Sequence, residues 1–297
     1  MELWPNFFIV GAPKAGTTSL YEYLKNIPGI YMSPVKEPNY FSIKAMPDKK
    51  PFRPIRNKEK YLDLFKNATN EVILGEASTL YLSDPEASTL IRKACPTARI
   101  LISLRDPVER LFSHYLMNVS RNWIKSSFKN QIHKEMNNKA DFTKPHIRLS
   151  ASLYSKDVQR YLDTFGKEHV KILIFEEFIK NPKVILEDIL KFLGVKNIIN
   201  NFEDVKVHNP YFKIESSGEI SKQILQSNII SKISVKILPS FGRRFFRKKI
   251  LTRKNTKKPV MKEADRQYLI DFYKSDVKKL EVLLGRKFPW KNFYEVN

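Results

Sequence analysis

The chain has a single cysteine, Cys95, and few acidic residues: 31 aspartates and glutamates against 53 lysines and arginines in 297 residues. One cysteine excludes an internal disulfide framework and is typical of a protein that folds in a reducing compartment. The shortage of acidic residues leaves a formal net charge of +22, which suits an anionic ligand, a nucleic acid or an acidic membrane surface. The charge alone does not choose among these partners.

Long apolar runs are absent too. No stretch of about 18 apolar residues occurs, so we expect no transmembrane helix. The first apolar run, at residues 7–10, leaves no room before it for the charged and apolar regions of a signal peptide. From these two features we expect a soluble, cytoplasmic protein.

Short apolar, β-branched runs alternate with amphipathic segments along the first two thirds of the chain. Such runs are typical of parallel strands buried on both faces of a sheet. They occur at residues 7–10, 72–74, 99–104 and 170–175. Helices are expected over residues 85–94, 107–117, 153–165 and 182–193. The alternation predicts an α/β, P-loop-like fold of three layers with a central, mostly parallel sheet flanked by helices.

Capping residues mark where several of these helices begin and end. Asp84 and Asp106 are expected N-caps, and each precedes a proline suited to the first helical position. Gly194 is expected to end the helix before it. Gly285 is expected to end a long amphipathic helix over residues 262–284.

We expect a single domain over residues 1–297. Residues 7–200 would form its α/β core, and residues 201–297 a basic, helical C-terminal region. Residues 45–60 are rich in proline and lysine and predict a surface loop. Residues 241–258 interleave phenylalanines with lysines and arginines, which indicates either a solvated basic face or a patch for an anionic membrane surface or acidic substrate.

Residues 7–20 join a buried strand to a helix through a tight turn. Such a turn leaves unpaired backbone N–H groups and the positive end of the helix dipole pointing outward, where a phosphate or sulfate binds readily. Lys14 adds a cation there, and hydroxyl donors come from Thr17, Thr18 and Ser19. The alternative is an ordinary strand–turn–helix with an incidental lysine.

The position of the lysine separates this loop from that of nucleoside triphosphatases. Their signature G-x-x-x-x-G-K-[ST] places the lysine directly after the second glycine. Here Thr17 follows Gly16, and the lysine lies at position 14. The segment therefore predicts a phosphate cradle whose cation lies beside the loop.

A second candidate site follows the strand predicted over residues 99–104. Arg105 lies at the carboxyl end of that strand, where open α/β sheets bind ligands, and Ser113 lies on the next helix. A guanidinium and a hydroxyl so placed can converge on one phosphate. The alternative is a structural ion pair between Arg105 and either Asp106 or Glu109.

A third candidate is Glu37, in the loop after the first helix. Because it precedes Pro38, its backbone is expected to be extended. A carboxylate near the cradle could accept a proton from a substrate hydroxyl. Taken alone, an exposed loop glutamate is more simply a solvated residue.

Together these segments resemble the sulfotransferases that use 3′-phosphoadenosine 5′-phosphosulfate (PAPS), in the heparan-sulfate-type and bacterial carbohydrate-type branch. Residues 11–20 look like the 5′-phosphosulfate loop of that family, residues 104–115 like its 3′-phosphate segment, and residues 36–41 like the loop with its catalytic glutamate. The resemblance implies that residues 7–200 bind PAPS, which leaves as 3′,5′-ADP. It implies sulfuryl transfer to a hydroxyl of a sugar, lipid headgroup or small molecule.

The same resemblance implies roles for individual residues. Glu37 would be the general base, and Lys14 would contact the bridging and sulfuryl oxygens. Arg105 and Ser113 would hold the 3′-phosphate. The residues that would hold the 5′-phosphosulfate are Lys14, Ala15, Gly16, Thr17, Thr18 and Ser19. The late basic element of the family has no clean counterpart, and the nearest stand-in is Lys257 with Lys258.

One segment departs from the heparan-type pattern Glu-Lys-[ST]-Pro-x-Tyr. Glu76 and Tyr81 match it, but Ala77 replaces the lysine and Thr79 the proline. Since that lysine faces the acidic sugar in the family, a uronic-acid polymer is not the expected acceptor.

Two other functions fit parts of the sequence. A P-loop-type kinase would need the Walker lysine and acidic magnesium ligands. A non-enzymatic binder of nucleic acid or anionic surfaces would explain the charge but not the ordered pair of phosphate sites, and no nucleic-acid recognition motif occurs. No cluster of His, Cys and Asp with ligand spacing indicates a metal.

Overall fold

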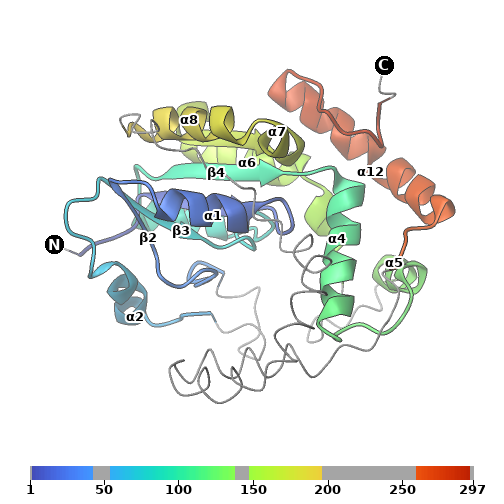
Figure 1. The fold of residues 1–297 in the computed structure, drawn as a ribbon, viewed down its shortest axis with the longest axis horizontal. Helices are drawn as coiled ribbons and strands as arrows, with labels where there is room; N and C mark the ends of the chain where they lie inside the picture. The colour runs from blue at the N-terminus through green and yellow to red at the C-terminus, as the bar shows by residue number, and fades with distance from the viewer. Residues whose placement is uncertain (1, 43–53, 138–146, 196–258, 295–297) are drawn as a thin grey trace, which may run out of the picture. The chain divides into compact units, whose positions relative to one another are not determined.

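Five strands form a parallel sheet in the order β2–β3–β1–β4–β5. Figure 1 shows strands β2, β3 and β4 of this sheet with helices packed around them. The strands are β1 (Phe7–Gly11), β2 (Ile30–Met32), β3 (Ile73–Ala77), β4 (Arg99–Leu104) and β5 (Val170–Ile174). Every residue of β1 and β3 is buried, as expected for parallel strands covered on both faces. The predicted α/β fold with a mostly parallel sheet is confirmed.

The computed structural model describes residues 2–42, 54–137, 147–195 and 259–294. Met1–Val207 and Met261–Asn297 form one unit, and His208–Val260 form a second. The elements described below belong to the first unit. Lys257, Lys258 and the basic stretch over residues 241–258 lie outside the described residues, so the roles predicted for them stay predictions.

Helices cover both faces of the sheet. They are α1 (Thr17–Lys25), α2 (Lys58–Leu62), α3 (Ala87–Ala94), α4 (Pro107–Ser120), α5 (Phe128–Met136), α6 (Ser155–Phe165), α7 (Phe175–Lys180), α8 (Pro182–Leu193) and α12 (Glu263–Leu284). Side chains of α1, α7 and α8 pack with Phe7 and Ile9 on one face. Those of α3, α6 and α12 pack with Phe8 and Val10 on the other, because successive strand residues point to opposite faces. None of the described helices has both the length and the apolarity needed to cross a membrane.

Several boundaries differ from the sequence prediction. The strand β2 was not predicted, because three residues are too few to show a period. Val72 is 71% exposed, and β3 begins one residue later. The helix α3 begins at Ala87, since Asp84 accepts the backbone N–H of Glu86 (3.0 Å) in a turn before the helix. The predicted loop over residues 45–60 lies partly outside the described residues, and its last three residues belong to α2.

The C-terminal helix α12 packs on α4 and α6. Its Asp276 carboxylate accepts the backbone N–H groups of Tyr154 (2.6 Å) and Ser155 (3.3 Å) at the start of α6. Beyond the helix, Trp290 is almost fully buried and stacks on Phe288 at 4.4 Å between ring centroids. The helix predicted over residues 262–284 is thus confirmed, and Gly285 ends it with a φ of 64°.

Candidate active site

The turn between β1 and α1 leaves the start of the helix open to an anion. Gly16 lies before α1 with a φ of 80°, and neither a side-chain cap nor an acidic residue occupies the first turn. A Cβ at Gly16 would come within 2.7 Å of the Phe175 ring, so a larger residue does not fit there. The predicted cradle therefore has the backbone that anion binding requires.

The carboxyl end of β4 fixes the shape of this loop. The backbone N–H of Ala12 donates to the carbonyl oxygen of Ser103 (2.6 Å), and the Ser103 hydroxyl donates to the carbonyl oxygen of Ala15 (2.5 Å). Within the loop, Thr17 and Ser19 are buried and Thr18 is exposed. The backbone of the cradle is thus held from the neighbouring strand before any ligand arrives.

Lys14 is half-buried in this loop and adopts a φ of 72°. Burial, together with the nearby positive charges of Arg121, Arg105, Arg110 and Lys36, lowers the pKa of its ammonium to about 8. Positive charges gathered in this way attract an anionic ligand.

Arg105 reaches back to the cradle from the end of β4. Its guanidinium donates to the carbonyl oxygen of Lys14 (3.1 Å) and lies 4.8 Å from the centre of the Phe175 ring. Its buried Nε has no hydrogen-bond partner among the described residues. A buried donor left unsatisfied is costly, so this atom fits a ligand that supplies an acceptor.

The acidic residues that follow Arg105 have other partners. Asp106 caps α4 by accepting the backbone N–H groups of Val108 (2.9 Å) and Glu109 (3.2 Å). Glu109 pairs with Arg266 at 2.6 Å. The cap predicted at Asp106 is therefore confirmed, and the alternative of a structural ion pair that occupies Arg105 is not supported. Ser113 lies half-buried on α4, two turns after the cap.

Glu37 has a backbone different from the one predicted. Its φ is 63°, which is uncommon for a residue other than glycine, where the sequence indicated an extended conformation. The cause is a contact with β3: the Glu37 N–H donates to the carbonyl oxygen of Ala77 (2.9 Å). Its carboxylate is 33% exposed, accepts from both the N–H and the hydroxyl of Thr79, and pairs with Lys36.

A second carboxyl group, that of Glu76, lies fully buried near Glu37. It accepts hydrogen bonds from the hydroxyls of Tyr61 (3.1 Å) and Ser78 (2.9 Å). Burial raises the pKa of the Glu76 carboxyl to about 7. Because it has no exposed surface, Glu76 is a structural group beneath the loop and not a candidate base.

These loops and this cationic site match a known family: residues 5–198 fit the model of the sulfotransferase family. The chain belongs to the sulfotransferase family. It is 28% identical to carbohydrate sulfotransferase 15 of Rattus norvegicus over 261 residues, which cover 69% of this chain and 46% of that protein. It is 23% identical to heparan sulfate glucosamine 3-O-sulfotransferase 3B1 of Mus musculus, over 96% of this chain and 65% of that protein. This chain thus spans less than two thirds of the length of these curated relatives.

A solved structure extends the similarity to nearly the whole chain. The sulfotransferase from Alicyclobacillus acidocaldarius is 31% identical and superposes with a TM-score of 0.70, over 97% of this chain and 99% of that chain. The resemblance inferred from the three sequence segments is therefore confirmed at the level of family and fold.

Sequence reasoning missed several residues that build the candidate site of this sulfotransferase. Ser103 and Phe175 shape the cradle, and Thr79 holds Glu37. Ser103 carried a usable signal, since it is a polar residue in an otherwise apolar strand. Thr79 showed only as a departure from the family pattern, and its contact with a residue 42 positions earlier has no local signature.

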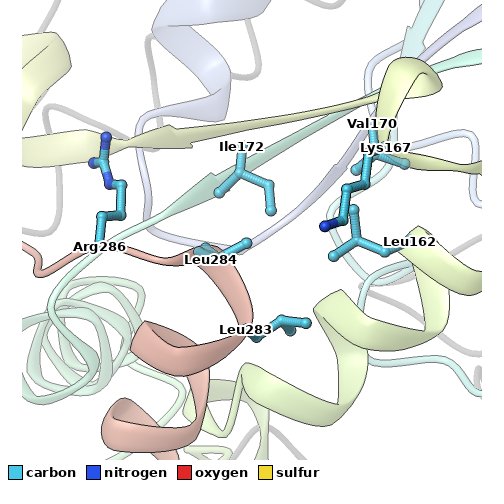
Figure 2. Close-up of a pocket in the computed structure, with 7 residues that line it drawn as sticks. All are labelled: Leu162, Lys167, Val170, Ile172, Leu283, Leu284 and Arg286. Atoms are coloured by element: carbon cyan, nitrogen blue, oxygen red, sulfur yellow. The ribbon is translucent and has the colours of Figure 1, made fainter.

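A separate pocket of about 270 Å³ lies between α6, β5 and the end of α12 (Figure 2). Five apolar side chains line it, and Figure 2 shows Lys167 and Arg286 at its two ends. None of the candidate site residues lines this pocket, so it plays no part in the site described above.

Proposed function

We propose that this sulfotransferase transfers the sulfuryl group of PAPS to a hydroxyl of a saccharide. One observation supports the donor most directly: the cradle at the start of α1 is tied to Arg105 through the carbonyl oxygen of Lys14. Two groups that can bind anions, the start of α1 and the Arg105 guanidinium, therefore lie side by side. PAPS carries a 5′-phosphosulfate and a 3′-phosphate, and such a pair of sites suits it.

In this proposal the two halves of the site divide the donor between them. Backbone N–H groups of residues 15–19 and the nearby hydroxyls hold the 5′-phosphosulfate, and Arg105 with Ser113 holds the 3′-phosphate. When bound, PAPS supplies an activated sulfuryl group. Lys14 stabilises the negative charge that develops on the bridging oxygen as the bond between this oxygen and sulfur breaks. No metal enters the proposal, and the described residues contain no group of three or more metal-ligating side chains.

Glu37 acts in the proposal as the general base. The acceptor oxygen forms a bond to sulfur, the bond from sulfur to the phosphate oxygen breaks, and the acceptor proton moves to the Glu37 carboxylate. Its partial exposure and its three hydrogen-bond donors suit a fixed carboxylate that still meets a substrate.

A saccharide is the acceptor that the relatives favour. The names of carbohydrate sulfotransferase 15 and heparan sulfate glucosamine 3-O-sulfotransferase 3B1 both specify sugars. A kinase is disfavoured, because Thr17 occupies the position at which a Walker loop carries its lysine. A lipid headgroup or membrane surface would engage residues 241–258, outside the described residues.

The substitution Glu37→Gln tests the role of the base. The amide cannot take the acceptor proton, so turnover should fall by about a hundredfold or more, the range typical of general bases. Affinity for 3′,5′-ADP should stay nearly intact, because Glu37 does not belong to the donor site. Turnover is measured as transfer of radiolabelled sulfate to a panel of neutral and acidic oligosaccharides, and affinity by calorimetry.

The exposed Glu22 on α1 provides the control, and Glu22→Gln should leave both quantities unchanged. Near-normal turnover in Glu37→Gln would remove Glu37 from the mechanism.

A further inference from the structure

The carboxylate of Glu37 is held by a neighbour that belongs to neither the cradle nor the Arg105 site. The backbone N–H of Thr79 donates to Oε2 of Glu37 (2.8 Å), and the Thr79 hydroxyl donates to Oε1 (3.0 Å). Thr79 thus donates a hydrogen bond to each carboxylate oxygen of Glu37. Lys36 Nζ adds a third donor, again to Oε1 (2.8 Å).

These donors leave the two carboxylate oxygens unequal. Each carboxylate oxygen can accept about two hydrogen bonds. Oε1 already accepts two among the described residues, from Thr79 and Lys36, whereas Oε2 accepts only the Thr79 N–H. The remaining acceptor position of Glu37 is therefore on Oε2.

Thr79 itself is firmly placed. It is 6% exposed and follows Ser78, whose backbone N–H donates to the carbonyl oxygen of Ile9 in β1 (3.1 Å). The Ser78 hydroxyl accepts the backbone N–H of Asn39 (3.0 Å) and donates to the buried Glu76. The two consecutive hydroxyl residues after β3 thus fix the Glu37 loop, one at its backbone and one at its carboxylate.

We propose that Thr79 is a positioning residue of the reaction, which orients Glu37 so that Oε2 receives the acceptor proton. The inference rests on the proposed function, because it takes Glu37 as the base. Thr79 acts only through Glu37: its hydroxyl occupies Oε1, and its N–H contacts Oε2 and sets the plane of the carboxylate.

The substitutions Thr79→Val and Thr79→Ser distinguish the effect of the Thr79 hydroxyl on kcat from the effect of the side-chain shape. Valine keeps the volume and the backbone N–H but removes the hydroxyl, so kcat should fall about tenfold or more, as expected for the loss of a hydrogen bond to a charged group. Serine keeps the hydroxyl and should stay within about twofold of the parent. The KM for PAPS and the affinity for 3′,5′-ADP should be unchanged in both variants.

Thr69 offers a matched control, since its N–H and hydroxyl donate to the carboxylate of Glu71 in an exposed turn. Thr69→Val should leave kcat unchanged. If Thr79→Val does not fold, as judged by its melting temperature, Thr79→Ala takes its place.

Crystal structures of the parent and Thr79→Val provide a readout that needs no acceptor. We expect the Glu37 carboxylate to rotate in the variant. A carboxylate that stays in place together with an unchanged kcat, or a Thr79→Ser variant as slow as Thr79→Val, would overturn the positioning role. A fully active Glu37→Gln variant would instead overturn the proposed function, while the crystallographic comparison would still report whether Thr79 holds Glu37.

Discussion

The charged form of Lys14 is destabilised in the free protein, and a bound anion would stabilise it. Burial and four neighbouring cations lower the pKa of its ammonium to about 8. Of the four non-glycine residues with positive φ in the described chain, three lie in the two candidate loops: Lys14, Glu37 and Asn39. Unfavourable backbone conformations and unfavourable charges both gather at functional sites, where the surrounding fold sustains them.

The lowered pKa of Lys14 predicts that affinity for 3′,5′-ADP depends on pH. Below pH of about 8 the free site is already protonated, and the affinity should be flat. Above that pH the neutral Lys14 amine must take up a proton when the anion binds, so affinity should fall by up to about tenfold per pH unit. Calorimetry between about pH 7 and 10 measures this dependence.

Lys14→Arg should remove the dependence, because a guanidinium stays charged over this range. Lys25→Arg, at the exposed end of α1, should keep it. An equal fall of affinity in the parent and in Lys14→Arg would contradict the assignment.

At the scale of elements, the C-terminal helix and the residues after it support the segment that carries the second candidate site. Asp276 on α12 accepts the first backbone N–H groups of α6, a helix that has no side-chain cap of its own. Beyond α12, Trp290 Nε1 donates to Glu176 (3.1 Å), and Asn292 Nδ2 donates to Asp106 (2.8 Å). Asn292 thus stabilises the start of α4, next to Arg105, although it lies 186 positions after Asp106 in the chain.

Asp276→Ala should lower the free energy of unfolding by about 1–2 kcal/mol, the usual cost of losing an N-cap. Urea denaturation measures the change. Asp271→Ala is the matched control, since Asp271 lies exposed on the same helix and accepts from the Gln267 side chain of its own helix, one turn earlier. Equal losses in the two variants would show that Asp276 does not act as a cap for α6.

The same elements show what the sequence could predict. The start of α4 at Pro107 and the ends of α8 and α12 at Gly194 and Gly285 follow from local capping signals, and the structure confirms all three. The backbone of Glu37 could not be predicted from Pro38, because contacts with β3, about forty residues away, override the local preference. Similarly, the link from Arg105 to the carbonyl oxygen of Lys14 depends on two strands lying side by side.

At the scale of the whole molecule, the net charge of +22 suits a protein that binds a polyanion, and the described structure places several of those cations around Lys14. Net charge favours any anion equally. The cradle and the Arg105 guanidinium, which are linked by a hydrogen bond, favour a ligand that carries negative charge at two positions. A preference for a 3′-phosphate would therefore separate the proposed donor site from a nonspecific basic surface.

Calorimetric binding of 3′,5′-ADP, compared with AMP and with ATP plus Mg²⁺, tests the proposed donor site. AMP lacks the 3′-phosphate, so 3′,5′-ADP should bind at least about tenfold more tightly, as expected for a charge-assisted contact to Arg105. Arg105→Ala should remove that preference while leaving AMP affinity nearly unchanged. Binding of ATP with Mg²⁺ as tight as that of 3′,5′-ADP, or a 3′-phosphate preference that persists in Arg105→Ala, would contradict it.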